Sequence, residues 1–206
     1  MKLIKINNIE VFNIHNALKG MRNPLESWDK LDSYYDCMGE YNVGEKDLEL
    51  ALKLVKAGTE HAKFMRQIFI STDITAPLYW WKEMDTYKIS TTANSTSTMH
   101  KIHTRYLTHN DFSYDKITPF RDNTLYHLNK IIKKYKGSGH KDKKIWRELI
   151  QDLPSSYNQL RTWTGNYQNL RNIYFQRKNH RLQEWEDFRN VIESLPYSIL
   201  ITCKKD

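Results

Sequence analysis

The stretch LPSSYNQLRTWTGNYQNLRNIYFQR, residues 153–177, carries the clearest fold signal in this chain. Its second half predicts a helix, because four residues recur with the spacing that places side chains on one helix face: Asn166, Leu170, Ile173 and Arg177. That face is mainly apolar and ends in an amide and a guanidinium. An arginine at the end of a buried stripe needs a partner, since an unpaired buried charge is very costly.

Two kinds of partner would satisfy this arginine. A phosphate-bearing ligand could bind Arg177 in bidentate geometry. A carboxylate from the following predicted helix, Glu184 or Asp187, could serve equally well. The residues alone leave both alternatives open, so Arg177 is a candidate anion-binding residue.

Outward from this stretch, the chain alternates predicted helices with a few strands. Strands are expected over residues 2–12, 68–75 and 197–203. Helices are expected over residues 45–57, 76–87 (with Thr75 as N-cap), 99–107, 119–136 (with Leu125, Leu128, Ile131 and Ile132 as its buried stripe), 143–153, 166–180 and 182–195. The pattern predicts an α+β fold: one mostly helical domain over residues 1–206, with a small mixed or antiparallel sheet.

Length and composition narrow the class of protein. The 206 residues are 39% hydrophobic and 27% charged, which is typical of a globular domain with a core of useful size. No apolar run approaches the roughly 18 residues of a membrane span, and the N-terminus lacks the continuous apolar stretch of a signal peptide. Cys37 and Cys203 cannot form a disulfide framework or a zinc cage by themselves. These features predict a reducing, cytoplasmic setting.

The formal net charge of +8 is unevenly distributed along the chain. Residues 26–60 carry nine acidic and four basic side chains, whereas residues 121–150 carry nine basic and three acidic ones. Most of these basic residues lie in KIIKKYKGSGHKDKK, residues 130–144. A solvated helix face with a lysine-rich loop explains the cluster, and so does attraction of phosphate-bearing ligands.

The segment STTANSTST, residues 90–98, consists almost entirely of hydroxyl side chains. Placed before a helix, such a run is either a phosphate site or an ordinary N-cap within a polar loop. His100 and His103 follow at the i, i+3 spacing that could place two imidazoles on one metal ion. No carboxylate or thiolate lies near them in sequence, so no metal site is predicted.

Taken in order, these segments resemble the flavin-dependent thymidylate synthases. Residues 153–177 are similar to the family's helix pair without a gap, and HRLQEWEDF, residues 180–188, looks like its His-Ala-Gln-Trp-Glu stretch with one residue inserted. The resemblance places Asn166 and Asn172 at flavin contacts and Arg177 on the dUMP phosphate. It also implies a mixed α/β fold and a homotetramer whose active site is shared between subunits.

A second match covers residues 69–101, where ITAP looks like the entry to the family's signature motif. The motif itself is eroded. Thr86, Tyr87 and Lys88 stand where Arg-His-Arg is expected, and Asn94 stands where a Glu is expected. Lys88 keeps a positive charge for the cofactor without the planar fork of a guanidinium.

The remaining substrate-binding candidates also come from the resemblance. Thr96 lies near the position of the serine that faces the nucleotide, with Ser95 and Ser97 as register alternatives. Arg147 loosely matches a further family arginine, about one helical turn out of register. No catalytic residue is assigned.

The activity that the resemblance implies is reductive methylation of dUMP or a related pyrimidine nucleotide. FAD would be the redox carrier, with NADPH and methylenetetrahydrofolate as co-substrates. The alternative is a non-catalytic protein on the same fold that binds a nucleotide or a single-stranded nucleic acid through residues 130–144 and exposed aromatic rings. A structural oligomer that has lost its ligand is a third interpretation.

Overall fold

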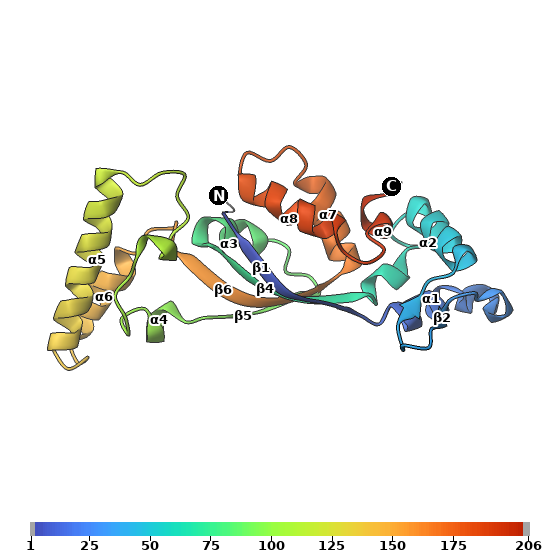
Figure 1. Ribbon diagram of the computed structural model, residues 1–206, viewed down its shortest axis with the longest axis horizontal. Helices are drawn as coiled ribbons and strands as arrows, with labels where there is room; N and C mark the ends of the chain where they lie inside the picture. The colour runs from blue at the N-terminus through green and yellow to red at the C-terminus, as the bar shows by residue number, and fades with distance from the viewer. Residues whose placement is uncertain (1–2, 204–206) are drawn as a thin grey trace. The chain divides into compact units, whose positions relative to one another are not determined.

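The computed structural model describes residues 3–203 and shows an α+β fold with more helix than strand (Figure 1). The helices are α1 (Ile14–Met21), α2 (Glu45–Ala57), α3 (Leu78–Met84), α4 (Thr98–Lys101), α5 (Pro119–Gly137), α6 (Lys143–Gln151), α7 (Tyr167–Gln176), α8 (Gln183–Glu193) and α9 (Ile199–Thr202). The strands are β1 (Lys5–Phe12), β2 (Tyr34–Tyr35), β3 (Tyr41–Asn42), β4 (Phe69–Pro77), β5 (Thr92–Ser95) and β6 (Asn158–Asn166). The predicted fold class is confirmed.

The strands form two sheets. One has four strands in the order β1-β4-β6-β5, and the other is the antiparallel pair β2-β3. Within β4, every second residue from Ile70 to Ala76 is buried. A period of two is what a pleated strand with one buried face requires. This burial confirms the strand predicted over residues 68–75.

The chain divides into two compact units. The α5 unit comprises residues 3–7, 73–86 and 93–162, and the α7 unit comprises residues 8–72, 87–92 and 163–203. The predicted site residues divide between them. Ser95, Thr96, Ser97 and Arg147 belong to the α5 unit, whereas Lys88, Asn166, Asn172 and Arg177 belong to the α7 unit. The single domain expected over residues 1–206 stays a prediction.

The core of the α5 unit lies between α5 and α6. The predicted stripe on α5 is buried or partly buried: Leu125, Leu128, Ile131 and Ile132. It packs in one cluster with Leu149 of α6 and with Leu107 and Phe112 from the segment before α5. Full burial of one such side chain stabilises the fold by about 1.5–3 kcal/mol. This stripe therefore fixes which face of α5 points inward and leaves the opposite face to solvent.

The core of the α7 unit is formed by α7 with α8 and α9, and Figure 1 shows α7 and α8 side by side. Leu170 and Ile173 are buried, as their helical spacing predicts. Trp185 of α8 and Ile201 of α9 are completely buried. The apolar face of α7 is therefore a core face, and the polar residues at its two ends lie at the boundary of this core.

The structure corrects two predictions about strand and helix type. Residues 197–203 contain α9 rather than a strand. A short apolar run does not distinguish a buried strand from a buried helix turn, and here Leu200, Ile201 and Thr202 are buried in succession. Residues 153–177 are not a helix pair, because their first half contains the strand β6 and only the second half is helical.

The structure also corrects two helix boundaries. The helix expected over residues 99–107 ends at Lys101, where the Thr104 hydroxyl donates to the Lys101 carbonyl. The helix expected from residue 76 begins at Leu78 with Pro77 as its N-cap. Thr75 is not the cap, because β4 continues two residues beyond it. The N-terminal strand predicted over residues 2–12 is β1, and residue 2 lies outside the described residues.

Over residues 3–203, no helix combines the length and the apolar character that crossing a membrane requires.

Candidate functional site

The start of α7 is fixed by Asn166, which ends β6 and caps the helix. Its side-chain oxygen accepts the Asn169 backbone N–H at 2.9 Å, and the Asn169 side chain accepts the Asn166 backbone N–H at 3.1 Å. These two reciprocal hydrogen bonds form a capping box. The residue before it is Gly165, where any side chain would collide with the Trp163 ring. Asn166 is only 3% exposed. The carboxamide is therefore held in one orientation, and part of its hydrogen-bonding capacity serves the helix.

One turn further along α7, two more amides form a pair. The Gln168 side-chain nitrogen donates to the Asn172 oxygen at 2.9 Å, and the Asn172 side chain is exposed. Gln168 is buried, and its oxygen has no hydrogen-bond partner among the described residues. Buried acceptors are normally satisfied, so this one calls for a donor from outside the described chain.

Arg177 follows the last residue of α7 and lies against two aromatic rings. Its guanidinium carbon is 4.5 Å from the centre of the Trp185 ring and 5.3 Å from that of Tyr87. The Arg177 Nε donates to the Tyr87 hydroxyl at 2.9 Å, and its Nη1 lies 3.2 Å from His180 Nε2. These contacts fix the plane of the guanidinium at a half-buried position.

The segment with Lys88 is held beside α7 by two contacts. One is the hydrogen bond from Arg177 to Tyr87, and the other runs from the Asn169 side chain to the Ile89 carbonyl at 2.9 Å. Lys88 lies between these two anchored residues and is exposed. The α7 unit thus places Asn166, Asn172 and Arg177 along one helix, with Asn166 and Arg177 at its opposite ends. Lys88 lies in the segment held beside that helix.

Sequence reasoning did not assign Tyr87, His180 or Trp185 to this site. Tyr87 contacts Arg177 across 90 positions of sequence, which no local periodicity reveals. In the sequence, Tyr87 is distinguished only by standing where the resemblance expects the histidine of the signature motif. His180 and Trp185 lie just beyond Arg177, in the segment 180–188 that resembles the family.

In the α5 unit, the hydroxyl tract lines a polar cavity of about 320 Å³. Thr96 donates its backbone N–H to the Leu160 carbonyl at 2.9 Å, and the Ser97 hydroxyl accepts the His100 N–H at 3.1 Å. Thr96 and Ser97 line the cavity together with Lys101 and Arg105. Ser95, in the exposed strand β5, is not among the lining residues.

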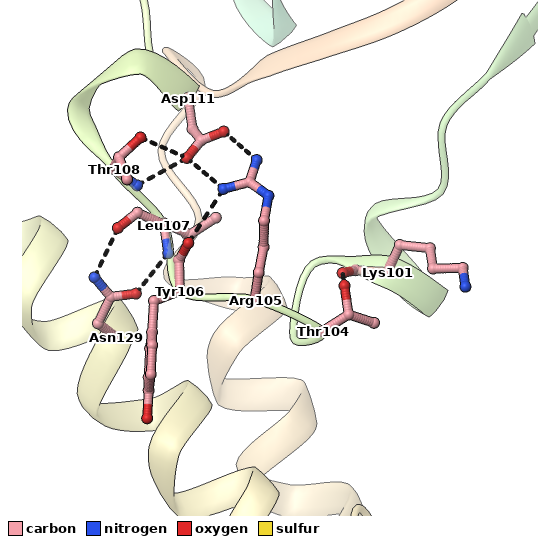
Figure 2. A network of polar contacts seen from close by, with 8 residues as sticks. All are labelled: Lys101, Thr104, Arg105, Tyr106, Leu107, Thr108, Asp111 and Asn129. Carbon is pink, nitrogen blue, oxygen red and sulfur yellow. Dashed lines mark hydrogen bonds and ion pairs between the residues drawn. The ribbon is translucent and has the colours of Figure 1, made fainter.

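One of the cations that line this cavity, Arg105, is already paired with a carboxylate, as Figure 2 shows. Arg105 pairs with Asp111 through both guanidinium ends, one at 2.8 Å. Burial raises the pKa of Asp111, but the Arg105 guanidinium and the Thr108 backbone N–H hold that pKa below its ordinary value. The Lys101 side chain points away from this network. The cavity therefore offers hydroxyls beside a neutralised ion pair and is a weaker anion site than the sequence pattern indicates.

Arg147 is exposed on α6 and does not line this cavity. Close to it, His127, Glu148 and Asp152 place ligand atoms within 4.8 Å of one another, and His127 Nε2 lies 2.8 Å from Asp152 Oδ2. The sequence pattern did not predict this group, because His127 lies on α5 whereas Glu148 and Asp152 lie on α6 and at its C-terminal end. His103 packs against the rings of Tyr135 and His140 at 5.0 and 5.2 Å.

Comparison with known proteins gives a match in fold. No protein-family model and no curated protein matches the sequence. Two solved structures of the flavin-dependent thymidylate synthase ThyX from Helicobacter pylori, both with FAD and dUMP, match the structure with TM-scores of 0.74 and 0.73. Their sequences are 14% and 15% identical to this chain, and each match covers 97% of this chain and 98% of the other. Along nearly its whole length, this chain has the fold of ThyX.

Proposed function

We propose that this protein is a flavin-dependent thymidylate synthase-like enzyme that acts on dUMP or a related pyrimidine nucleotide. The observation that carries the proposal is the fold match to FAD- and dUMP-bound ThyX over 97% of the chain. The gap-free resemblance of residues 153–177 to that family supports it independently.

In this proposal, Arg177 binds the phosphate of the nucleotide. Its guanidinium plane is already fixed by Trp185 and Tyr87, so little side-chain entropy is lost when a phosphate binds. A planar guanidinium matches phosphate oxygens in bidentate geometry, which a lysine cannot reproduce. Ser95, Thr96, Ser97 and Arg147 are the further substrate-binding residues of the proposal.

The amides of α7 fit a flavin ring. The isoalloxazine edge presents a ring N–H between two carbonyls, so it can both donate to an amide oxygen and accept from an amide nitrogen. Asn172 offers an exposed carboxamide, which the Gln168 side-chain nitrogen holds in place by donating to its oxygen at 2.9 Å. Asn166, Asn172 and Lys88 are therefore the proposed cofactor-binding residues, with Gln168 as the residue that orients Asn172.

Bound FAD would supply hydride transfer, with NADPH as reductant and methylenetetrahydrofolate as carbon donor. The chain's own residues would hold and orient the two ring systems, Arg177 from the phosphate end and the α7 amides from the flavin edge. The homotetramer with a shared active site and the cytoplasmic location belong to the same proposal. The missing signature arginines make catalysis the most demanding part of it, because preorganised charges contribute much of a typical rate enhancement.

Binding of FAD and dUMP to the purified protein tests this function. We expect flavin fluorescence to change on titration with protein and dUMP to bind by calorimetry. Arg177→Ala should weaken dUMP binding by roughly 100-fold, the worth of two charge-assisted hydrogen bonds. Arg181→Ala removes an exposed arginine one turn away and is the matched control. Asn172→Ala should weaken FAD binding, with the exposed Asn190→Ala of α8 as its control.

Each outcome bears on the proposal. A colourless protein that binds neither FAD nor dUMP would overturn it. If both ligands bind but no turnover occurs in the presence of methylenetetrahydrofolate and NADPH, the proposed binding site is supported and the proposed enzymatic activity is wrong. Circular dichroism of Arg177→Ala separates loss of ligand from loss of fold, since this arginine also packs on Trp185.

A further inference from the structure

The outward face of α5 combines lysines with tyrosines. Tyr126, Lys130, Lys133 and Lys134 follow one another at helical spacing on the side opposite the buried stripe. Together with Tyr106 and Asn129 they line a groove of about 620 Å³. We call this the α5 groove. The flavin proposal makes no use of this groove, although three of its lining residues belong to the lysine-rich segment 130–144.

Tyr106 is held in place before any ligand binds. The Asn129 side chain accepts the Leu107 backbone N–H at 2.8 Å and donates to the Leu107 carbonyl at 2.9 Å. Arg105 donates to the Tyr106 carbonyl at 3.1 Å, and the Lys136 ammonium lies 4.7 Å from the centre of the Tyr106 ring. Figure 2 shows the ring lying along α5 beside Asn129. Tyr106 is nevertheless 51% exposed, so a fixed aromatic ring faces solvent.

The groove is positively charged and contains no acidic lining residue. Within residues 3–203, Lys130, Lys133 and Lys134 form no ion pair. The carboxylates nearest in sequence are already engaged, Asp122 with His109 at 2.9 Å and Asp142 with the Lys144 backbone N–H at 2.8 Å, where it caps α6. The three ammonium groups are therefore available to phosphates from outside the chain.

We propose that the α5 groove binds single-stranded nucleic acid. Phosphates would contact Lys130, Lys133 and Lys134, and bases would stack on Tyr106 and on Tyr126, which is 71% exposed. A cationic groove with exposed aromatic rings is the general solution for single strands, because every base has a stacking face and every nucleotide a phosphate. Two separate rings and three lysines provide more binding groups than one mononucleotide can occupy. This activity is independent of the flavin site.

Fluorescence anisotropy with labelled oligothymidylate and oligouridylate tests the proposal. A length of about 20 nucleotides exceeds the roughly 4–16 that a single-strand-binding fold covers. Three phosphate contacts predict a slope near −2 in log affinity against log salt, or roughly a 20-fold loss between about 50 and 200 mM. The two probes distinguish single-stranded DNA from single-stranded RNA as the ligand. Binding of either probe supports the proposal that the α5 groove binds single strands.

Matched variants locate the binding. The triple variant Lys130→Gln/Lys133→Gln/Lys134→Gln should lose roughly 20-fold in affinity at low salt and most of the slope. Its control, Lys19→Gln/Lys53→Gln/Lys56→Gln, removes the same charge from exposed positions of the α7 unit and should change the affinity little. Tyr106→Leu should weaken binding roughly tenfold through loss of stacking, and Tyr106→Phe should restore it.

Three outcomes would overturn the proposal. They are equal losses in the two triple variants, displacement of the oligonucleotide by saturating dUMP and FAD, and binding only to vesicles of anionic lipid. Unchanged circular dichroism is expected for every variant, because all seven substituted side chains are exposed. Failure of FAD and dUMP binding would not affect the result, so the two proposals fail separately.

Discussion

The α7 unit and the α5 unit both place cations against aromatic rings, but they do so in opposite ways. In the α7 unit, the ring beneath Arg177 belongs to Trp185, which is completely buried. In the α5 unit, Tyr106 and Tyr126 are largely exposed and stand beside lysines that form no ion pair among the described residues. The same type of contact, a cation beside an aromatic ring, thus fixes one guanidinium in the α7 unit and leaves an exposed aromatic surface in the α5 unit.

This difference separates two kinds of phosphate recognition. A single guanidinium, fixed in its plane, selects one phosphate by geometry. Several mobile ammonium groups attract a chain of phosphates by charge and are indifferent to its sequence. In the two proposals, burial of the ring is therefore what distinguishes the site for a small ligand from the surface for a polymer.

The largest contrast should appear when the rings themselves are removed. Trp185→Ala should cost about 3–5 kcal/mol of unfolding free energy, because it empties a fully buried position. Tyr106→Ala should cost no more than about 1 kcal/mol, roughly the worth of its exposed contact with Lys136. Urea denaturation followed by circular dichroism measures both.

Trp185→Phe serves as the control, since it keeps a ring beneath Arg177 and should recover much of the loss. Similar costs for Trp185→Ala and Tyr106→Ala would show that the two rings are equivalent. The contrast between a structural ring and a ligand-facing ring would then be wrong.

Charge-conserving exchanges should sharpen the contrast. Arg177→Lys keeps the charge but loses the planar fork and its hydrogen bond to Tyr87, so dUMP binding should weaken roughly tenfold. Lys130→Arg in the α5 groove should leave oligonucleotide affinity within about twofold, because charge dominates there. Calorimetry and anisotropy give the two affinities. A tenfold loss in the groove variant, or none in Arg177→Lys, contradicts this division.

The sequence was informative wherever structure depends on local spacing. The buried stripe of α5, the strand over residues 68–75 and the core face of α7 all follow from periodicity, and all three are present. The choice between helix and strand is predicted wrongly where an apolar run is short, as in α9, and where the alternation of buried and exposed residues is weak, as in β6. Such runs satisfy helix and strand equally, and packing against α7 decides between them in α9.

The candidate sites show the same limit. Asn166 and Arg177 could be placed on one helix from their spacing, and the lysine cluster over residues 130–144 was visible in the composition. Their partners could not be identified, because Tyr87 reaches Arg177 across 90 positions and Tyr106 reaches α5 from the segment before it. Contacts of that kind arise only from tertiary packing.

The helix caps of the two regions should differ by a smaller amount. Asn166→Ala removes a 2.9 Å cap bond and half of a capping box, so we expect a loss of about 1–2 kcal/mol in unfolding free energy. Thr118→Ala removes a longer bond of 3.4 Å to Arg121 at the start of α5 and should cost about 0.5 kcal/mol. Chemical denaturation resolves the difference.

Asn166→Asp separates the cap from the proposed flavin contact. Aspartate caps a helix as well as asparagine does but cannot donate a hydrogen bond, so stability should be retained while FAD binding weakens. Retention of both stability and FAD affinity in Asn166→Asp would remove Asn166 from the cofactor site.

The smallest expected effect is a shift in the pKa of His103, which responds to the charges around it in the α5 unit. Burial lowers the pKa of His103, and the nearby charges of His140, Lys136 and Lys101 lower it further. Because the folded pKa lies below the unfolded value, the unfolded chain binds more protons between the two values, and stability decreases as pH falls through this window. A phosphate chain on α5 should offset the lysine charges and raise the pKa of His103. NMR titration of the imidazole with and without oligothymidylate measures the shift, and an unchanged pKa in the saturated complex would indicate that the strand binds away from this face of the molecule.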